Sequence, residues 1–157
     1  MKKFASQNDL DEKKISFDEI GNGLFAFTAE GDPNSGIIIG DDSVMVIDAQ
    51  ATPTLARQVI EKVRSVTDKP TSHLVLSHYH AVRVLGASEY KANNIIMSSK
   101  ARSMVVERGQ EDWDSEFDRF PRLFKGHEEI PGLTWPTTTF DKKMSLFLGK
   151  RQVDLYF

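Results

Sequence analysis

The chain has 157 residues, of which 39% are hydrophobic and 27% charged, a balance typical of one soluble globular domain. Its formal net charge of −3 gives no sign of the basic face that a nucleic-acid-binding protein usually has. Cysteine is absent, which excludes disulfides, thiolate nucleophiles and cysteine-ligated zinc.

The first residues carry two lysines but no apolar stretch behind them, so they do not resemble a secretory signal. No apolar run approaches the roughly 20 residues of a membrane span. We therefore expect a cytoplasmic protein without membrane association. Residues 1–14 are expected to form a loose polar lead-in, and residues 15–157 to form the domain.

Short strand-like runs follow the lead-in, separated by turns such as Asn22-Gly23. Their close spacing predicts an antiparallel meander. Two of the runs are apolar on both faces, which indicates a sheet covered on both sides. The expected strands are residues 15–20, 24–29, 36–39 and 44–47.

The first helix is expected to begin at Pro53 with Thr52 as its N-cap, since a capping residue followed by proline is typical of a helix start. Apolar residues then recur at helical spacing, and Pro70 follows the end of this pattern. The pattern afterwards alternates between strands and helices, and Gly109 is expected to cap the third helix. The expected elements are a strand at 73–77, helices at 84–92 and 99–108, and strands at 95–97, 137–140, 144–148 and 152–157.

Phe117, Phe120 and Phe124 recur at helical spacing in a segment rich in charged residues. They predict an amphipathic helical segment that packs one aromatic stripe on the body and that Pro121 kinks or shortens. The other interpretation is a partner groove or a substrate lid. The order of all these elements predicts an α/β (α+β layered) domain with a mixed sheet.

The candidate site lies just beyond the strand expected at residues 73–77. His78 and His80 stand two residues apart, so in extended backbone their side chains point to the same side and can converge on one metal ion. The end of a strand is also where open α/β sheets place ligands. The opposing interpretation is a surface or structural pair, since short His-x-His runs also occur on ordinary loops.

The run from Asn34 to Asp42, the apolar strand that ends at Asp48, the proline-started helix, and Leu74-Val75-Leu76-Ser77-His78-Tyr79-His80 together resemble the metallo-β-lactamase superfamily. The resemblance covers roughly residues 24–98. It implies an αββα sandwich of two similar halves, of which this sequence supplies the N-terminal half, with helices on one face of the sheet.

The family's His-x-His-x-Asp-His motif is only half kept. His78 and His80 match its first two histidines, which bind the first metal. The motif's aspartate falls at Val82 and its last histidine at Arg83. Valine has no ligand atom and arginine is permanently cationic, so we expect at most a one-metal site for zinc or a similar divalent ion. The family's remaining ligands would lie past residue 157.

Asp48 matches the strand-end aspartate of the family and is a candidate catalytic residue; alternatively, it caps backbone amides of the following turn. Arg83 is a candidate for neutralising an anionic substrate or a developing oxyanion, with Tyr79 as an additional donor. The alternative for Arg83 is an ion pair with Glu89 or Asp48. His127, in a polar loop, is expected to be exposed.

Three hypotheses follow from the sequence. The first is a metal-dependent hydrolase of an ester, amide or thioester, acting on a small molecule. The second is a non-catalytic relative that serves as a small-molecule binding module or scaffold. The third is an incomplete chain, because a lone half leaves an apolar sheet face exposed. We expect a homodimer or a missing C-terminal half to cover that face, unless the strands after Pro136 fold back over it.

Overall fold

The computed structural model describes residues 9–157, and the part of the expected lead-in at residues 1–8 lies outside them. Residues 9–14 form no helix or strand. They are held by ion pairs, because Lys13 Nζ lies 2.8 Å from the Asp9 carboxylate and Asp9 lies 3.8 Å from Arg122. Within the described residues, no helix is both long and apolar enough to cross a membrane.

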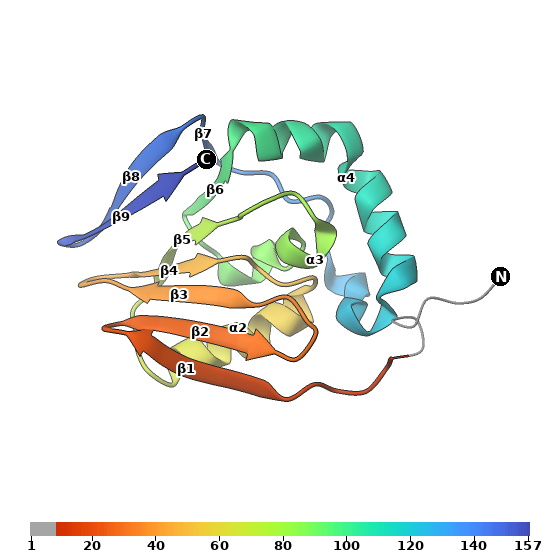
Figure 1. Ribbon diagram of the computed structural model, residues 1–157, viewed down its shortest axis with the longest axis horizontal. Coiled ribbons are helices and arrows are strands. Elements are labelled where there is room, and N and C mark those ends of the chain that lie inside the picture. Colours follow the sequence, from red (N-terminus) through yellow and green to blue (C-terminus); the bar gives the residue numbers. More distant parts are fainter. Residues whose placement is uncertain (1–8) are drawn as a thin grey trace.

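A seven-stranded mixed sheet forms the centre of the domain, with its strands in chain order from β1 to β7 (Figure 1). The first four strands pair antiparallel and the last four pair parallel. The predicted meander is therefore confirmed, and two of its strands have the predicted bounds. The strands are β1 (Ile15–Gly21), β2 (Leu24–Ala29), β3 (Ser35–Ile39), β4 (Val44–Ile47), β5 (Thr71–Val75), β6 (Asn94–Ser98) and β7 (Thr138–Phe140).

The helices begin at the residues that the sequence marks most clearly. Helix α2 (Pro53–Arg64) starts where predicted, and the Thr52 side chain accepts a hydrogen bond from the Leu55 N–H. Helix α4 (Ser99–Arg119) likewise starts at the predicted residue. The remaining helical segments are short: α3 (Ala81–Val84), η1 (Ala87–Tyr90), η2 (Pro121–Phe124) and η3 (His127–Glu129).

Two helix predictions were wrong. The helix expected at residues 84–92 is divided into α3 and η1, with Gly86 between them. A side chain at Gly86 would lie 2.3 Å from the Ala49 carbonyl oxygen, so glycine allows this turn to contact the loop after β4. The helix expected to end at Gly109 continues for ten more residues, so Gly109 lies inside α4 and is not its cap.

The predicted aromatic stripe is confirmed as packing on the body. Phe124 is buried, and its ring contacts that of Phe117 with centroids 5.4 Å apart. Phe120 packs against the same core cluster. As predicted, the helix ends close to Pro121, which begins the 3-10 turn η2.

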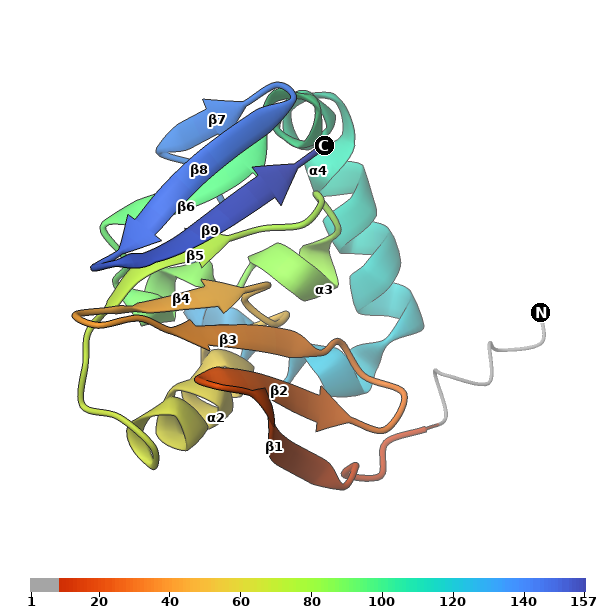
Figure 2. The same ribbon diagram turned by 60° about the vertical axis from the view of Figure 1, so that its left-hand side comes forward.

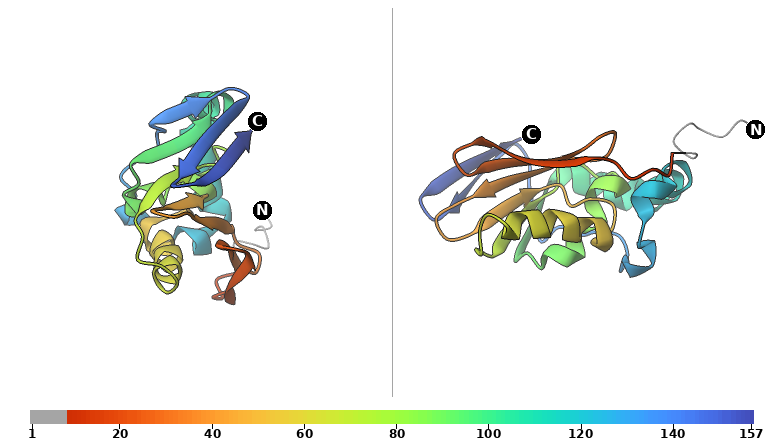
Figure 3. Two further views of the ribbon diagram at one scale, coloured as in Figure 1. Left: turned by 90° about the vertical axis from the view of Figure 1, so that its left-hand side faces the viewer. Right: turned by 90° about the horizontal axis from the view of Figure 1, so that it is seen from below.

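Helices cover one face of the sheet, and a separate hairpin covers part of the other (Figures 2 and 3). The hairpin consists of β8 (Lys143–Leu148) and β9 (Arg151–Tyr156). Its inward side chains bury Met45, Val75 and Ile96 of the central strands together with Leu148. The closing strands thus fold back over the sheet, so the expectation of a bare apolar face is wrong at β4 to β6. The homodimer inferred from that face stays a prediction.

Candidate functional site

The candidate site is built on the loops that follow the parallel strands β4 and β5. Asp48 follows β4 and has a positive φ of 63°, and Gln50 has a φ of 69°. A non-glycine residue is strained in this conformation, and contacts with neighbouring residues must offset that strain. The Asp48 N–H donates to the Val75 carbonyl at 2.8 Å, and the buried Gln50 side chain donates to the Pro33 carbonyl and to Ser35 Oγ.

Asp48 anchors the loop that carries the histidines. Its Oδ1 accepts a hydrogen bond from the Ser77 N–H, and its Oδ2 accepts one from Ser77 Oγ, both at 2.8 Å. Arg83 Nη1 lies 3.4 Å from the same Oδ2, while Glu89 pairs with Arg57 instead. Asp48 therefore makes the Arg83 ion pair considered from the sequence, whereas the backbone N–H that it accepts is that of Ser77 and not one of the turn that follows Asp48. Its catalytic role stays a prediction.

His78 and His80 lie side by side, with ring centroids 4.7 Å apart and planes inclined by 73°. Both line an open cleft of about 590 Å³ to which Val82, Arg83 and Glu116 also contribute. Burial lowers the pKa of His78, and the neighbouring His80 lowers it further. The structure thus places both predicted metal ligands and Arg83 on one cleft.

Tyr79 is placed differently from its neighbours. Its ring packs edge-on against His80, at 4.8 Å between centroids, and against the main core. It does not belong to the residues that line the described cleft. Its predicted role in substrate binding stays a prediction.

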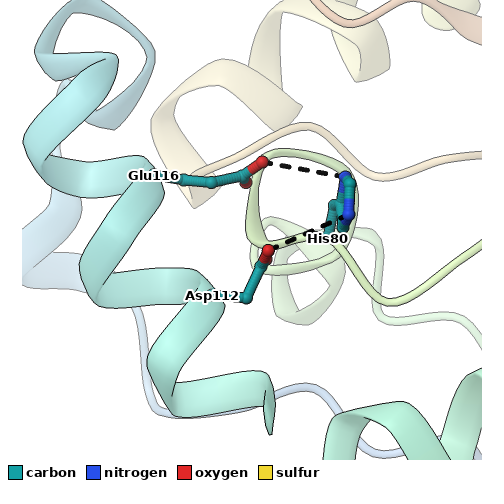
Figure 4. A group of neighbouring side chains, drawn as sticks. All are labelled: His80, Asp112 and Glu116. Atoms are coloured by element: carbon teal, nitrogen blue, oxygen red, sulfur yellow. Dashed lines mark ion pairs between the residues drawn. The ribbon is translucent and has the colours of Figure 1, made fainter.

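Two carboxylates on α4 complete the surroundings of His80 (Figure 4). Asp112 Oδ1 lies 3.9 Å from His80 Nε2, and Glu116 Oε1 lies 3.8 Å from His80 Nδ1. The second oxygen of each carboxylate accepts a backbone N–H at the start of α3, from Ala81 and Val82 respectively, at 2.8 Å. These hydrogen bonds orient both carboxylates toward the imidazole.

Sequence reasoning missed Asp112 and Glu116. They lie beyond Gly109, where the helix was expected to have ended. Their spacing of four residues was the available signal, because residues i and i+4 share one face of a helix. No pattern in the sequence indicated that this face meets the loop after β5.

Glu116 is buried, and desolvation raises the pKa of its carboxyl, although the hydrogen bond from the Val82 N–H acts in the opposite direction. A carboxyl whose pKa is raised by folding stabilises the fold below its unfolded-state pKa, and this contribution is lost as pH rises through the raised value.

We therefore expect Glu116→Gln to stabilise the metal-free protein at neutral pH, since glutamine also accepts the Val82 hydrogen bond without a buried charge. Urea unfolding in chelator between about pH 4 and pH 8 measures this effect. The exposed Glu111→Gln on the same helix is the control. A less stable Glu116→Gln at neutral pH would contradict the prediction.

The donor set around His80 fits a divalent metal ion. One ligand atom each from His80, Asp112 and Glu116 lies within 4.8 Å of the others. An imidazole nitrogen and carboxylate oxygens are zinc ligands, and three protein ligands are usual at catalytic zinc. His78 stands beside this group without being a member of it. His127 is 54% exposed at its side chain, as predicted.

No family model matches the chain. Its structure is similar to that of a metallo-beta-lactamase from Pontibacter korlensis, with a TM-score of 0.64 and 14% identity over 92% of this chain. It is also similar to the sec-alkylsulfatase Pisa1 from Pseudomonas sp., with a TM-score of 0.69 and 17% identity over 90% of this chain and 27% of that one. The chain has the metallo-β-lactamase fold.

The metallo-β-lactamase fold is present here over part of its usual extent, because the chain spans 60% of the length of the Pontibacter protein. A third similar structure is the metallo-beta-lactamase FIM-1 from Pseudomonas aeruginosa in its mono-zinc form, with a TM-score of 0.52 and 18% identity. That match covers 62% of this chain and 48% of FIM-1. The predicted fold class, with a mixed sheet and helices on one face, is confirmed.

Proposed function

We propose that the chain carries the site of a metal-dependent hydrolase with one divalent ion of the zinc type. The observation that supports this most directly is the convergence of His80, Asp112 and Glu116 beside His78 in one cleft. The candidate ligands are these four residues. The α4 carboxylates would supply the negative charge that this chain lacks where Val82 stands in place of the motif's aspartate.

A bound ion of this type acts as a Lewis acid and activates water for hydrolysis. Arg83 would neutralise an anionic substrate or a developing oxyanion from its position on the cleft. Asp48 would hold Arg83 in place through their ion pair at 3.4 Å. The proposed substrate is a small molecule with an ester, amide or thioester bond, and the proposed location is the cytoplasm.

A non-catalytic binding module or scaffold is the second candidate. Two features favour it. By the resemblance of the sequence, Val82 and Arg83 stand where the motif has ligands, and Asp112 and Glu116 already accept the first N–H groups of α3. In such a protein, the α4 carboxylates would orient the His80 loop without binding a metal.

The test is elemental mass spectrometry of the purified protein, combined with a zinc titration of the chelator-treated protein. Zinc-dependent turnover is then measured on a panel of ester, amide and thioester substrates. We expect one ion per chain and turnover that chelator abolishes. A protein that takes up no ion on titration would favour the binding module.

A further inference from the structure

The hydroxyl of Ser77 connects Asp48 to His78. Ser77 Oγ lies 2.8 Å from Asp48 Oδ2 and 2.8 Å from His78 Nδ1. Two consecutive hydrogen bonds thus connect the buried carboxylate of Asp48, through the Ser77 hydroxyl, to the His78 imidazole on the cleft.

The number of protons on each group determines which atoms donate and which accept in these hydrogen bonds. A carboxylate can only accept, and a serine hydroxyl has one proton to donate. Ser77 therefore donates to Asp48, and its oxygen accepts the hydrogen bond from His78. The proton of the neutral imidazole must then reside on Nδ1, which leaves the lone pair on Nε2.

The two ring nitrogens of His78 differ in their hydrogen bonding. Nδ1 is directed toward Ser77, and Nε2 has no hydrogen-bond partner anywhere in residues 9–157. A metal-binding histidine usually donates its other ring N–H to a protein group, which sets the tautomer and orients the ring. Asp48 and Ser77 supply such a group here.

We infer that Ser77 is a positioning residue which, backed by Asp48, holds His78 in the tautomer that offers its Nε2 lone pair to a divalent metal ion in the cleft. The metal part of this inference rests on the proposed function. The tautomer part concerns the metal-free protein alone.

A second serine–histidine pair provides a matched control. Ser72 Oγ lies 2.7 Å from His73 Nδ1, again between neighbours in sequence. No carboxylate hydrogen-bonds to Ser72 within the described residues. The Ser72 hydroxyl is therefore free to donate to His73, and this pair does not fix a tautomer.

The first measurement is the nitrogen-15 NMR spectrum of histidine-labelled, metal-free protein at about pH 8, where imidazole is neutral. We expect His78 to carry its proton on Nδ1 in the wild type and in Ser77→Thr, which keeps the hydroxyl. In Ser77→Ala, we expect a mixture with a large share of the Nε2–H tautomer. Ser72→Ala should leave His78 unchanged.

The second measurement is a zinc titration. We expect Ser77→Ala to weaken zinc binding by about 10- to 100-fold, the usual effect of removing a group that orients a ligand. Ser72→Ala and Ser77→Thr should bind as the wild type does. An unchanged His78 tautomer in Ser77→Ala, or an unchanged zinc affinity, would overturn the inference. If the tautomers and zinc affinities are as expected but the protein hydrolyses no substrate of the panel, the result contradicts the proposed function and leaves this inference intact.

Discussion

Replacing His80 with alanine is expected to weaken the binding of a zinc-type ion by at least about 100-fold, more than the loss of an orienting group typically costs. His80 is the nitrogen donor that both α4 carboxylates face, at 3.9 and 3.8 Å. Without it, Asp112 and Glu116 would remain as two oxygen donors beside the cleft. A competition titration against a chromophoric chelator measures the change.

His127→Ala is the control for this experiment. Its side chain is 54% exposed and lies outside the proposed set of ligands. The His80 side chain makes no capping hydrogen bond to α3, so the fold of His80→Ala should remain intact by circular dichroism. Equal zinc affinity in His80→Ala and His127→Ala would remove His80 from the site.

Leu148→Ala is expected to lower the free energy of unfolding by about 2–5 kcal/mol, the range for truncation of a buried leucine. Leu148 is fully buried between the hairpin and the sheet, against Met45, Val75 and Ile96. Truncation removes apolar contacts on both sides and leaves a cavity. Urea unfolding with linear extrapolation gives the value.

The neighbouring Phe147→Ala is the matched control, because Phe147 points outward and is 61% exposed. Its substitution should change the free energy of unfolding by no more than about 0.5 kcal/mol, as for other surface positions. If both variants were equally stable, the hairpin would not pack on the sheet in solution. Light scattering on the same samples determines whether the chain forms the predicted homodimer.

Local signals in the sequence predicted most of the elements. The bounds of β2 and β4 followed from short apolar runs between turn residues, and the start of α2 followed from the Thr52-Pro53 start signal. The two wrong helix predictions both concern a glycine. Gly86 stands where the loop after β4 approaches closely, a role that leaves no local signature, and Gly109 lies inside α4 instead of capping it.

The candidate site, too, was predictable only where its residues are neighbours in the sequence. His78 and His80 lie on the loop after β5, and Arg83 lies in the short helix α3 directly after it, so the sequence placed them together. The α4 carboxylates lie 31 and 34 residues further along the chain than Ala81 and Val82, whose N–H groups they accept. Their position depends on how α4 crosses the ends of the strands, which is a property of packing rather than of local sequence.

The hairpin on the sheet also has a consequence for the order in which the chain is synthesised. Strands β4, β5 and β6 are complete once Ser98 has been made, whereas β8 and β9 come only at residues 143–156. Translation at roughly 5–20 residues per second separates these events by several seconds. During that interval Met45, Val75 and Ile96 lack their cover, so the nascent chain presents an apolar surface to chaperones until β9 emerges from the ribosome.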